Sequence, residues 1–307
     1  MEFFRASTHI PFMRMKNNAF ILSITILLLS ILCVTYRGLS LSLDFTGGNM
    51  LTLSFPQNVS TEYIRSKLPT GRKQAGVQML GGSQKVLIKL PLSDTEDKLQ
   101  IESIMQLFPE ATLDHNSYIG PQVGEELLLG GVNAIVFALL FTMIYIALRF
   151  EYRFAVSAIV ALLHDPIVTL GIFSLLQIEF DLITLAGVLT ILGYSLNDTI
   201  VVYDRIKENF TKNPYAEVSV VVDTAINETL SRTIITSGLT FLAVLSLCVF
   251  GGPSLWGFSL SLAIGIIVGT YSSIYVAGAL AVLLGLQADS LLTPIQRREE
   301  YQVLEGN

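Results

Sequence analysis

The sequence predicts an α-helical membrane protein with six transmembrane helices and a ferredoxin-like α+β domain after the first of them. Three observations support this fold class. Of the 307 residues, 51% are hydrophobic and only 14% are charged, whereas soluble domains carry charge on about a quarter of their positions. Six apolar runs approach or exceed the roughly 20 residues that a membrane span needs. A single long polar stretch, residues 37–127, separates the first run from the other five.

The first apolar run, residues 19–36, follows a leader (residues 1–18) that contains Arg5, Arg14 and Lys16. A basic leader before an apolar run is also typical of a cleaved signal peptide. The segment after the run, "CVTYRGLSLSLDF", contains no A-x-A-like cleavage site, however. We therefore expect an uncleaved membrane anchor.

The polar stretch predicts a small domain with six elements. "NMLTLSF" alternates like a strand, and "STEYIRSKL" is typical of a short helix that begins at Ser60 or Thr61. "GVQMLG" and "QKVLIKL" indicate two strands, "SDTEDKLQIESIMQLF" has helical spacing, and "TLDHNSYIG" returns as a strand. The order β-α-β-β-α-β is that of a ferredoxin-like sandwich.

The other five spans are expected within residues 128–286, at about 128–148, 154–176, 181–203, 233–250 and 256–286. The connector 204–232 is longer than the others, and an apolar stripe in it predicts an amphipathic helix near 214–230. That helix either lies on the membrane surface or packs on the end of the bundle. In the last span, Gly265-x-x-x-Gly269 is typical of a close helix contact.

The distribution of basic residues predicts the orientation. Lys and Arg lie in the leader, in the connectors around residues 149–153 and 205–232, and in the tail, residues 287–307. The connectors "QIEFD" and "FGGPS" on the other side contain none. The positive-inside rule therefore places both termini in the cytoplasm and the α+β domain outside it.

Two ionisable residues, Asp198 and Arg232, are expected at membrane depth. Asp198 lies six residues before Asp204, so it is roughly 9 Å inside the expected boundary at 1.5 Å per residue. A carboxylate in a span costs about 2.5–3.5 kcal/mol and normally has a functional role. Burial disfavours its charged form and a nearby guanidinium favours it, so the pair could exchange a proton. The alternatives are a static pair that fixes helix register, or an arginine that extends to the interface.

Further polar residues lie beside these two. Tyr194, Ser195, Asn197 and Thr199 surround Asp198 in sequence and could hold a water or pass on a hydrogen bond. His164 and Asp165 form a second polar group, followed by Pro166. Because a proline frees a backbone carbonyl one turn back, these side chains could stabilise a local kink or relay protons.

Other classes of site are not indicated. The sequence contains no Walker loop, zinc-binding helix or nucleophile elbow. His9 and His115 show no ligand spacing, and Cys33 and Cys248 lie in apolar runs like small buried residues. We expect no enzymatic activity, no metal, no cofactor and no nucleic-acid partner. If this chain performs mechanical work, the energy would then have to come from an ion gradient or from a partner.

Four phrases in order resemble the SecF family. They are "LDFTGG" (43–48), "GYSLNDTIVVYDRIKEN" (193–209), "LSRTIITSG" (230–238) and "FGG…GTYSSIYVAG" (250–278). The resemblance implies half of a bundle of the resistance-nodulation-division (RND) superfamily, with six spans and an extracytoplasmic domain after the first. It also implies a subunit of the bacterial inner membrane that acts with SecD, driven by the proton motive force, in late translocation and release of secreted proteins.

The resemblance further implies partners and site residues. The implied partners are SecD, the translocon subunits SecY, SecE and SecG, YajC and YidC, translocating preproteins and the lipid bilayer. Asp198 and Arg232 match the positions implicated in proton conduction, with protons as the coupling ion. The entry motif to the periplasmic domain comprises Asp44, Phe45, Thr46, Gly47 and Gly48. Pro166 departs from the family pattern, in which an aliphatic residue follows the His-Asp pair.

Two other function classes remain open at this stage. The chain could be a structural subunit that anchors SecD near the translocon, with the acid and arginine as an assembly contact. It could instead be an efflux permease of the same superfamily, which would predict a ligand pocket and either a homodimer or a chain about twice as long.

Overall fold

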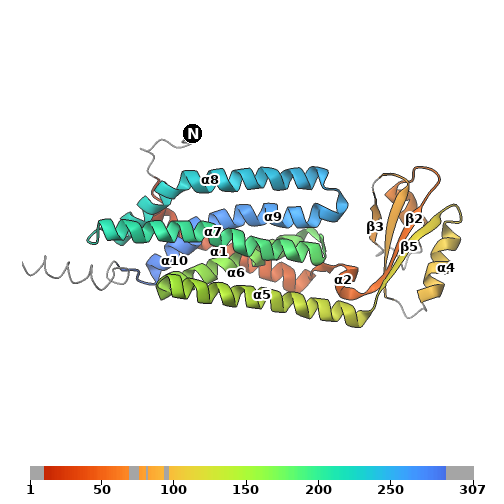
Figure 1. The fold of residues 1–307 in the computed structure, drawn as a ribbon, viewed down its shortest axis with the longest axis horizontal. Coiled ribbons are helices and arrows are strands. Elements are labelled where there is room, and N and C mark those ends of the chain that lie inside the picture. The colour runs from red at the N-terminus through yellow and green to blue at the C-terminus, as the bar shows by residue number, and fades with distance from the viewer. Residues whose placement is uncertain (1–9, 69–75, 81, 93–96, 288–307) are drawn as a thin grey trace, which may run out of the picture.

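The computed structural model describes residues 10–68, 76–80, 82–92 and 97–287, which form a helical bundle with a small α+β domain at one end (Figure 1). Six of the described helical segments are long and apolar enough to cross a membrane, which confirms the predicted fold class. They are α1 Lys16–Arg37, α5 Pro121–Arg149, α6 Tyr152–Leu176, α7 Leu182–Lys212, α8 Val218–Phe250 and α9 Pro253–Ser272, the last continuing through a π-helical segment, Ser273–Ala277, into α10 Gly278–Leu283. The expected tail lies outside the described residues except for Gln287, as do the first nine residues of the leader.

Helices α6, α7 and α9 form the centre of the bundle. They pack against one another, while α1 packs on α6 and α8 packs on α7 and α9. Helix α5 is the most peripheral, because only Gly124 and Ile146 of its 29 residues are buried. The apolar side chains on the rest of α5 therefore face outward, as expected for a surface against lipid or a partner helix.

Two glycines allow α7 and α9 to approach closely. A Cβ atom on Gly265 would overlap the Ile191 side chain, and one on Gly269 would lie 3.1 Å from the Ser195 Cβ. The small-residue motif therefore brings α9 against α7. This contact aligns the polar residues in the middle of both helices.

The amphipathic segment near 214–230 is not a separate helix. Helix α8 runs unbroken from Val218 to Phe250, so this segment is continuous with the fifth span. Its apolar stripe, which includes Val222 and Ala225 at 0% exposure, packs into the main core of the bundle. The stripe is thus buried against the bundle and does not lie on a membrane surface.

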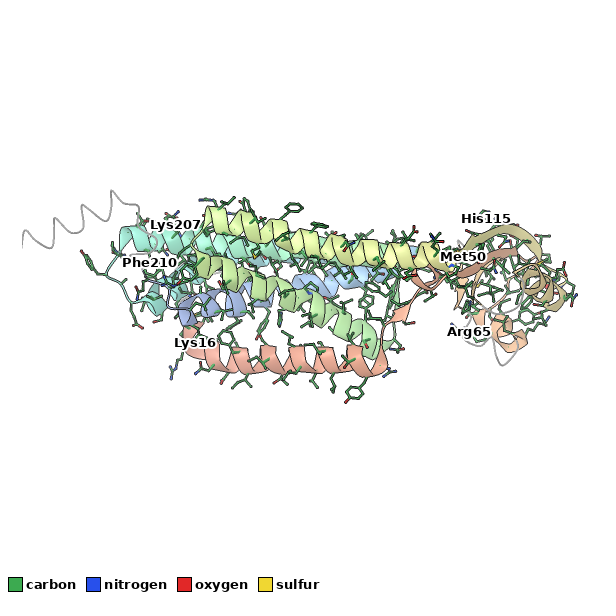
Figure 2. All side chains as sticks on the ribbon, turned by 90° about the horizontal axis from the view of Figure 1, so that it is seen from below. Lys16, Met50, Arg65, His115, Lys207 and Phe210 are labelled. Carbon is green, nitrogen blue, oxygen red and sulfur yellow. The ribbon has the colours of Figure 1, made fainter. Side chains whose placement is uncertain are left out.

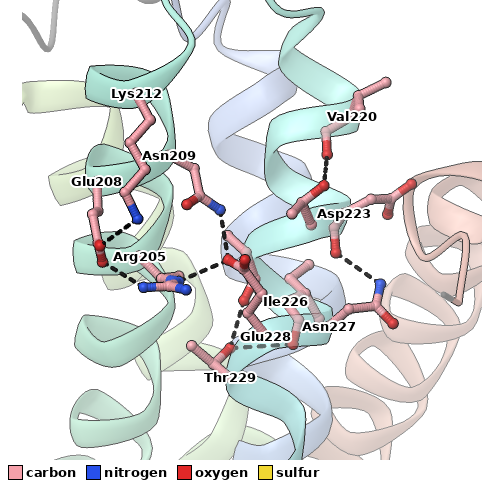
Figure 3. Close-up of polar contacts among 12 residues, drawn as sticks. Arg205, Glu208, Asn209, Lys212, Val220, Asp223, Ile226, Asn227, Glu228 and Thr229 are labelled. Atoms are coloured by element: carbon pink, nitrogen blue, oxygen red, sulfur yellow. Dashed lines mark hydrogen bonds and ion pairs between the residues drawn. The ribbon is translucent and has the colours of Figure 1, made fainter. Parts of the chain in front are cut away.

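Ion pairs join α7 and α8 at the end of the bundle away from the domain (Figure 3). Arg205 on α7 donates to Glu228 on α8 at 2.7 Å and to Glu208 at 2.6 Å, and Asn209 also donates to Glu228. Lys212 pairs with Glu208 one turn along. Lys16, Lys207 and Phe210 lie at this same end, opposite the labelled domain residues (Figure 2).

The segment before α1 is anchored at this same end. The Asn227 side chain accepts a hydrogen bond from the Ile10 amide and donates one to the Ile10 carbonyl. Phe12 and Met13 are 4% and 5% exposed within the main core, and the Met13 amide donates to Asp223. The start of the described chain is therefore packed into the bundle.

The α+β domain has the predicted order of elements: β2 Gly48–Ser54, α3 Thr61–Lys67, β3 Gly76–Met79, β4 Lys85–Pro91, α4 Asp97–Leu107 and β5 Thr112–Ile119. The sheet order is β3-β4-β2-β5 and every neighbouring pair is antiparallel. Leu51 and Ile88 on one face of the sheet pack with Ile64, Ile104 and Phe108 from the helices, all at 0% exposure. This arrangement confirms the ferredoxin-like prediction.

Candidate proton-conduction site

Asp198 is buried in the middle of the bundle and is held by hydroxyl groups. It lies on α7 and is 3% exposed. Ser237 on α8 donates a hydrogen bond to Asp198 Oδ2 at 3.2 Å, and Thr270 on α9 donates to Ser237 Oγ at 3.0 Å. The three helices thus converge on one carboxyl through a chain of two hydroxyls. Such a chain can reorient its hydrogen bonds when the carboxyl gains or loses a proton.

Arg232 lies apart from this carboxyl. Its side chain is exposed on α8, five residues before Ser237. Within the described part of the chain, no ion pair joins Arg232 to Asp198, although the guanidinium is near enough to act on it electrostatically. The static pair that the sequence left open is therefore not formed in this structure.

The polar neighbours of Asp198 in sequence point to several different places. Asn197 is exposed, and Thr199 donates to the backbone carbonyl of Ser195 at 3.1 Å. The Tyr194 hydroxyl is buried and has no hydrogen-bond partner among the described residues. Ser195 donates to Asp165. None of the four is hydrogen-bonded to Asp198 in the region described.

Asp165 on α6 is a second buried carboxyl, at 0% exposure. Its Oδ2 accepts hydrogen bonds from Ser195 on α7 at 2.5 Å and from Ser272 on α9 at 2.9 Å. Its Oδ1 lies 3.0 Å from His164 Nδ1. Helix α6 continues through Pro166, and among the described residues no side-chain hydrogen bond of His164 or Asp165 goes to a backbone carbonyl. Their contacts are with each other and with α7 and α9.

The hydroxyl donors Ser237, Thr270 and Ser272 were not singled out by the sequence. Each lies inside an apolar span, where serine and threonine also commonly donate to their own helix backbone. The sequence signal that could have identified them is that small polar residues in membrane spans face other helices more often than lipid. Among the described residues, no group of three or more His, Cys, Asp or Glu side chains could hold a metal ion.

The motif from Asp44 to Gly48 joins the bundle to the α+β domain. It follows strand β1, Ser40–Leu41, which pairs in parallel with β6, Glu179–Phe180. Helix α2, Leu43–Thr46, comes next, and Asp44 Oδ2 accepts a hydrogen bond from the Leu182 amide at the start of α7. A carboxylate there satisfies one free amide and favours the positive end of the helix dipole.

The remaining residues of this motif pack tightly. Phe45 stacks on Phe180 with ring centroids 6.0 Å apart, and Thr46 donates to the Ser42 carbonyl. Gly47 and Gly48 have φ angles of +74° and +142°, which only glycine adopts without strain. The glycines therefore make the reversal that starts strand β2.

The bundle, its buried carboxyls and the attached domain define a polytopic membrane protein with polar groups shared between central helices. Residues 100–287 match the family model described as "Protein export membrane protein SecD/SecF, C-terminal", and residues 37–59 match the "SecD/SecF GG Motif". The chain belongs to the SecD/SecF family of protein-export membrane proteins, on the SecF side of that family.

Curated relatives cover the full length of the chain. It is 42% identical to the protein translocase subunit SecF of Vibrio alginolyticus, over 97% of both chains. It is 38% identical to the SecF subunit of Pseudomonas aeruginosa, over 93% of this chain and 94% of that one.

Two solved structures share the fold. SecDF from Thermus thermophilus, described as a translocon-associated membrane protein, aligns with a TM-score of 0.79 and 38% identity over 92% of this chain. SecDF in the super-membrane-facing form aligns with a TM-score of 0.73 and 35% identity over 99%. The chain spans 39% and 41% of these two SecDF chains, so it corresponds to one part of them.

Proposed function

We propose that this chain acts with SecD in the Sec export machinery and couples the proton gradient to late translocation and release of secreted proteins. The observation that carries the proposal is the burial of Asp198 beside the Ser237 hydroxyl, with no cation paired to it in the described residues. An unpaired carboxylate in hydrocarbon is costly, and a proton removes the charge. Membership of the SecD/SecF family supports a role of this site in protein export.

The mechanism requires no bond-making chemistry by this chain, and its coupling ion is the proton. Protonation of Asp198 neutralises the buried charge and changes its hydrogen bond to Ser237, so that α7, α8 and α9 repack. A proton that crosses the full membrane releases about 2.3 kcal/mol per 100 mV. That amount is enough to bias a two-state movement of the α+β domain relative to the bundle.

The proposed setting follows from charge. Arg205 and Lys212 lie on α7 on either side of Lys207, which is at the bundle end away from the α+β domain (Figure 2). Arg149 pairs with Asp204 on the same stretch of α7, and Arg153 lies at the start of α6. The positive-inside rule assigns that end and both termini to the cytoplasm of a bacterial inner membrane. We include as partners the translocon subunits SecY, SecE and SecG, together with YajC, YidC and the translocating preprotein.

Export measurements in cells and in inverted vesicles test the proposal. Asp198→Asn keeps the shape of the side chain and removes the titratable group, so we expect loss of the part of export that depends on the proton gradient. Asp204→Asn is the matched control, since Asp204 is an exposed acid on the same helix that pairs with Arg149 at 3.1 Å. Export that depends equally on the gradient in Asp198→Asn and in wild type would overturn the proposal.

A structural role is the second candidate, because the outward face of α5 offers an apolar surface for a partner helix. In that case the chain mainly anchors SecD. Co-purification separates the two functions: a conduction variant such as Asp198→Asn keeps SecD bound, whereas a variant that disrupts an anchoring contact loses it.

A further inference from the structure

The pair His164–Asp165 has a set of hydrogen bonds of its own, apart from that of Asp198. The carboxyl and the imidazole are 0% and 3% exposed. Among the described residues, their hydrogen-bond partners, Ser195 and Ser272, form no side-chain hydrogen bond with Asp198. Asp198 in turn takes its hydrogen bond from Ser237. The bundle therefore contains two separate carboxyl sites, and the proposed function uses only one of them.

The hydrogen bonds of this pair fit an ionised Asp165 beside a neutral His164. Oδ2 of Asp165 accepts from two serine hydroxyls, of which Ser272 also lies 3.1 Å from the Gly269 carbonyl. Oδ1 faces His164 Nδ1. A carboxylate accepts at both oxygens, and a neutral imidazole with its proton on Nδ1 donates to Oδ1. This form of the pair carries one net negative charge.

The other imidazole nitrogen is the open position. His164 Nε2 is buried and has no hydrogen-bond partner in the part of the chain that the structure describes. The nearest aromatic ring, Tyr271 on α9, is 6.4 Å away between centroids, and its hydroxyl already donates to the Ala19 carbonyl on α1. In the carboxylate state, Nε2 therefore holds a free lone pair directed into the protein.

Few other ionisable groups face the pair. Helix α9 and the π-helical segment present Tyr271 and Tyr275, whose rings are tilted against each other with centroids 5.3 Å apart. Helix α7 presents Ser195, with Asp198 nearly one turn further on. Helices α1 and α5 carry charged residues only near their ends, and α10 carries none. No lysine or arginine forms an ion pair with Asp165 within the described ranges.

We propose that His164 and Asp165 form a second proton-binding site, in which His164 Nε2 takes up the proton and Asp165 balances the resulting charge. The incoming proton bonds to Nε2, and the Nδ1 proton stays in its hydrogen bond to Oδ1. The pair changes from a net charge of −1 to 0, and no bond to carbon forms or breaks. Ser195 and Ser272 connect this change to α7 and α9, the same two helices that contribute to the Asp198 site.

The inference extends the proposed function but has its own readout. Nitrogen-15 NMR of imidazole-labelled full chain in nanodiscs reports the tautomer and charge of each histidine. The chain has three histidines, His9, His115 and His164, and the spectrum of His164→Gln assigns the third. We expect His164 to begin as the Nδ1–H tautomer and to become imidazolium as the pH is lowered.

Two variants sharpen this test. Asp165→Asn removes the balancing carboxylate, so we expect the proton affinity of His164 to fall about tenfold or more. Ser272→Ala should alter the His164 signal, whereas Ser259→Ala should not, since Ser259 is a buried serine on α9 that donates only to backbone carbonyls. A His164 that stays neutral while the protein is folded, or that titrates identically in Asp165→Asn, overturns the inference.

The Asp198→Asn background separates this inference from the proposed function. A distinct site predicts that His164 still titrates in Asp198→Asn, whatever happens to export there. Loss of the His164 titration in Asp198→Asn would show that the two carboxyls act as a single site and would refute the inference. Dispersed amide spectra and co-purification with SecD confirm for each variant that the fold is retained.

Discussion

Asp165 and Asp198 are both held by serine hydroxyls, and neither has a lysine or arginine as an ion-pair partner among the described residues. Hydroxyl donors stabilise a carboxylate less than a guanidinium does, and they can also accept a hydrogen bond from the protonated acid. Asp198 can therefore change its protonation state without leaving a buried cation unpaired, and Asp165 is available to balance a protonated His164. That property suits a site that binds and releases protons repeatedly.

Ser237→Ala tests the contribution of a single hydroxyl. It removes the donor to Asp198 and leaves a buried polar group unsatisfied, which typically costs about 1–3 kcal/mol. We expect a loss of stability of that size in equilibrium unfolding of the reconstituted protein. Ser246→Ala on the same helix is the control, since Ser246 donates only to the Leu242 carbonyl. Equal losses of stability in the two variants would show that the hydrogen bond from Ser237 to Asp198 contributes no more than the hydrogen bond of Ser246 to its own helix.

The site residues differ in how far the sequence could predict them. Asp198 was identifiable because an ionisable residue inside an apolar run is costly. Its donors were not, since nothing in the sequence gives the rotation of α8 and α9 relative to α7. The sequence placed Ser195 beside Asp198, but helix packing turns its hydroxyl to Asp165. Spacing along one helix therefore located the acids, and contacts between helices decided their partners.

At the scale of elements, periodicity predicted the ferredoxin-like order and the six spans. It could not distinguish a surface helix from the packed start of α8, because both show the same apolar stripe. Strands β1 and β6 were not predicted either, since two residues each are too few to show alternation. They form only because the ends of α1 and α6 lie side by side.

The entry to strand β2 gives a prediction at this scale. Gly48 and Gly82 have similar φ angles, +142° and +149°, but a Cβ atom on Gly48 would overlap the Leu90 carbonyl while Gly82 has open space around it. Gly82→Ala should therefore cost only backbone strain, about 1–3 kcal/mol. Gly48→Ala should cost more, because β2 and β4 must also separate. Hydrogen exchange of the domain amides in the full chain measures both.

One result for these two glycine variants would contradict the prediction. If Gly48→Ala and Gly82→Ala destabilise the domain equally, the close approach to Leu90 carries no energetic weight. The glycine would then be required only for its backbone angle.

For the whole molecule, the proposed mechanism requires that a change at the carboxyls reaches the α+β domain through the junction between domain and bundle. Among the described residues, the junction includes the β1–β6 pair, the helix α2, which packs against α5, and the ion pair between Lys89 and Glu179. A groove of about 500 Å³ lies beside them, lined by Met50 and Leu87 of the sheet and by Ile183 and Trp256 of the bundle. The domain and the bundle therefore do not pack against each other across the whole junction. This groove leaves room for the domain to move relative to the bundle if the remaining contacts rearrange.

The ion pair between Lys89 on β4 and Glu179 on β6 spans this junction at 2.6 Å. Lys89 is 14% exposed and Glu179 is 43% exposed, and partly exposed pairs are worth about 0–1 kcal/mol. Such a pair biases the position of the domain without fixing it.

Lys89→Glu should replace attraction by repulsion and widen the distance distribution between spin labels on the domain and the bundle. The double variant Lys89→Glu/Glu179→Lys should restore both the narrow distribution and export, because the pair is reformed with its charges exchanged. If the distance distribution of the double variant is as wide as that of Lys89→Glu alone, Lys89 acts by packing and not by charge. An unchanged distribution in Lys89→Glu would mean that the β1–β6 pair and α2 hold the domain by themselves, and coupling between bundle and domain would then have to pass through those backbone links.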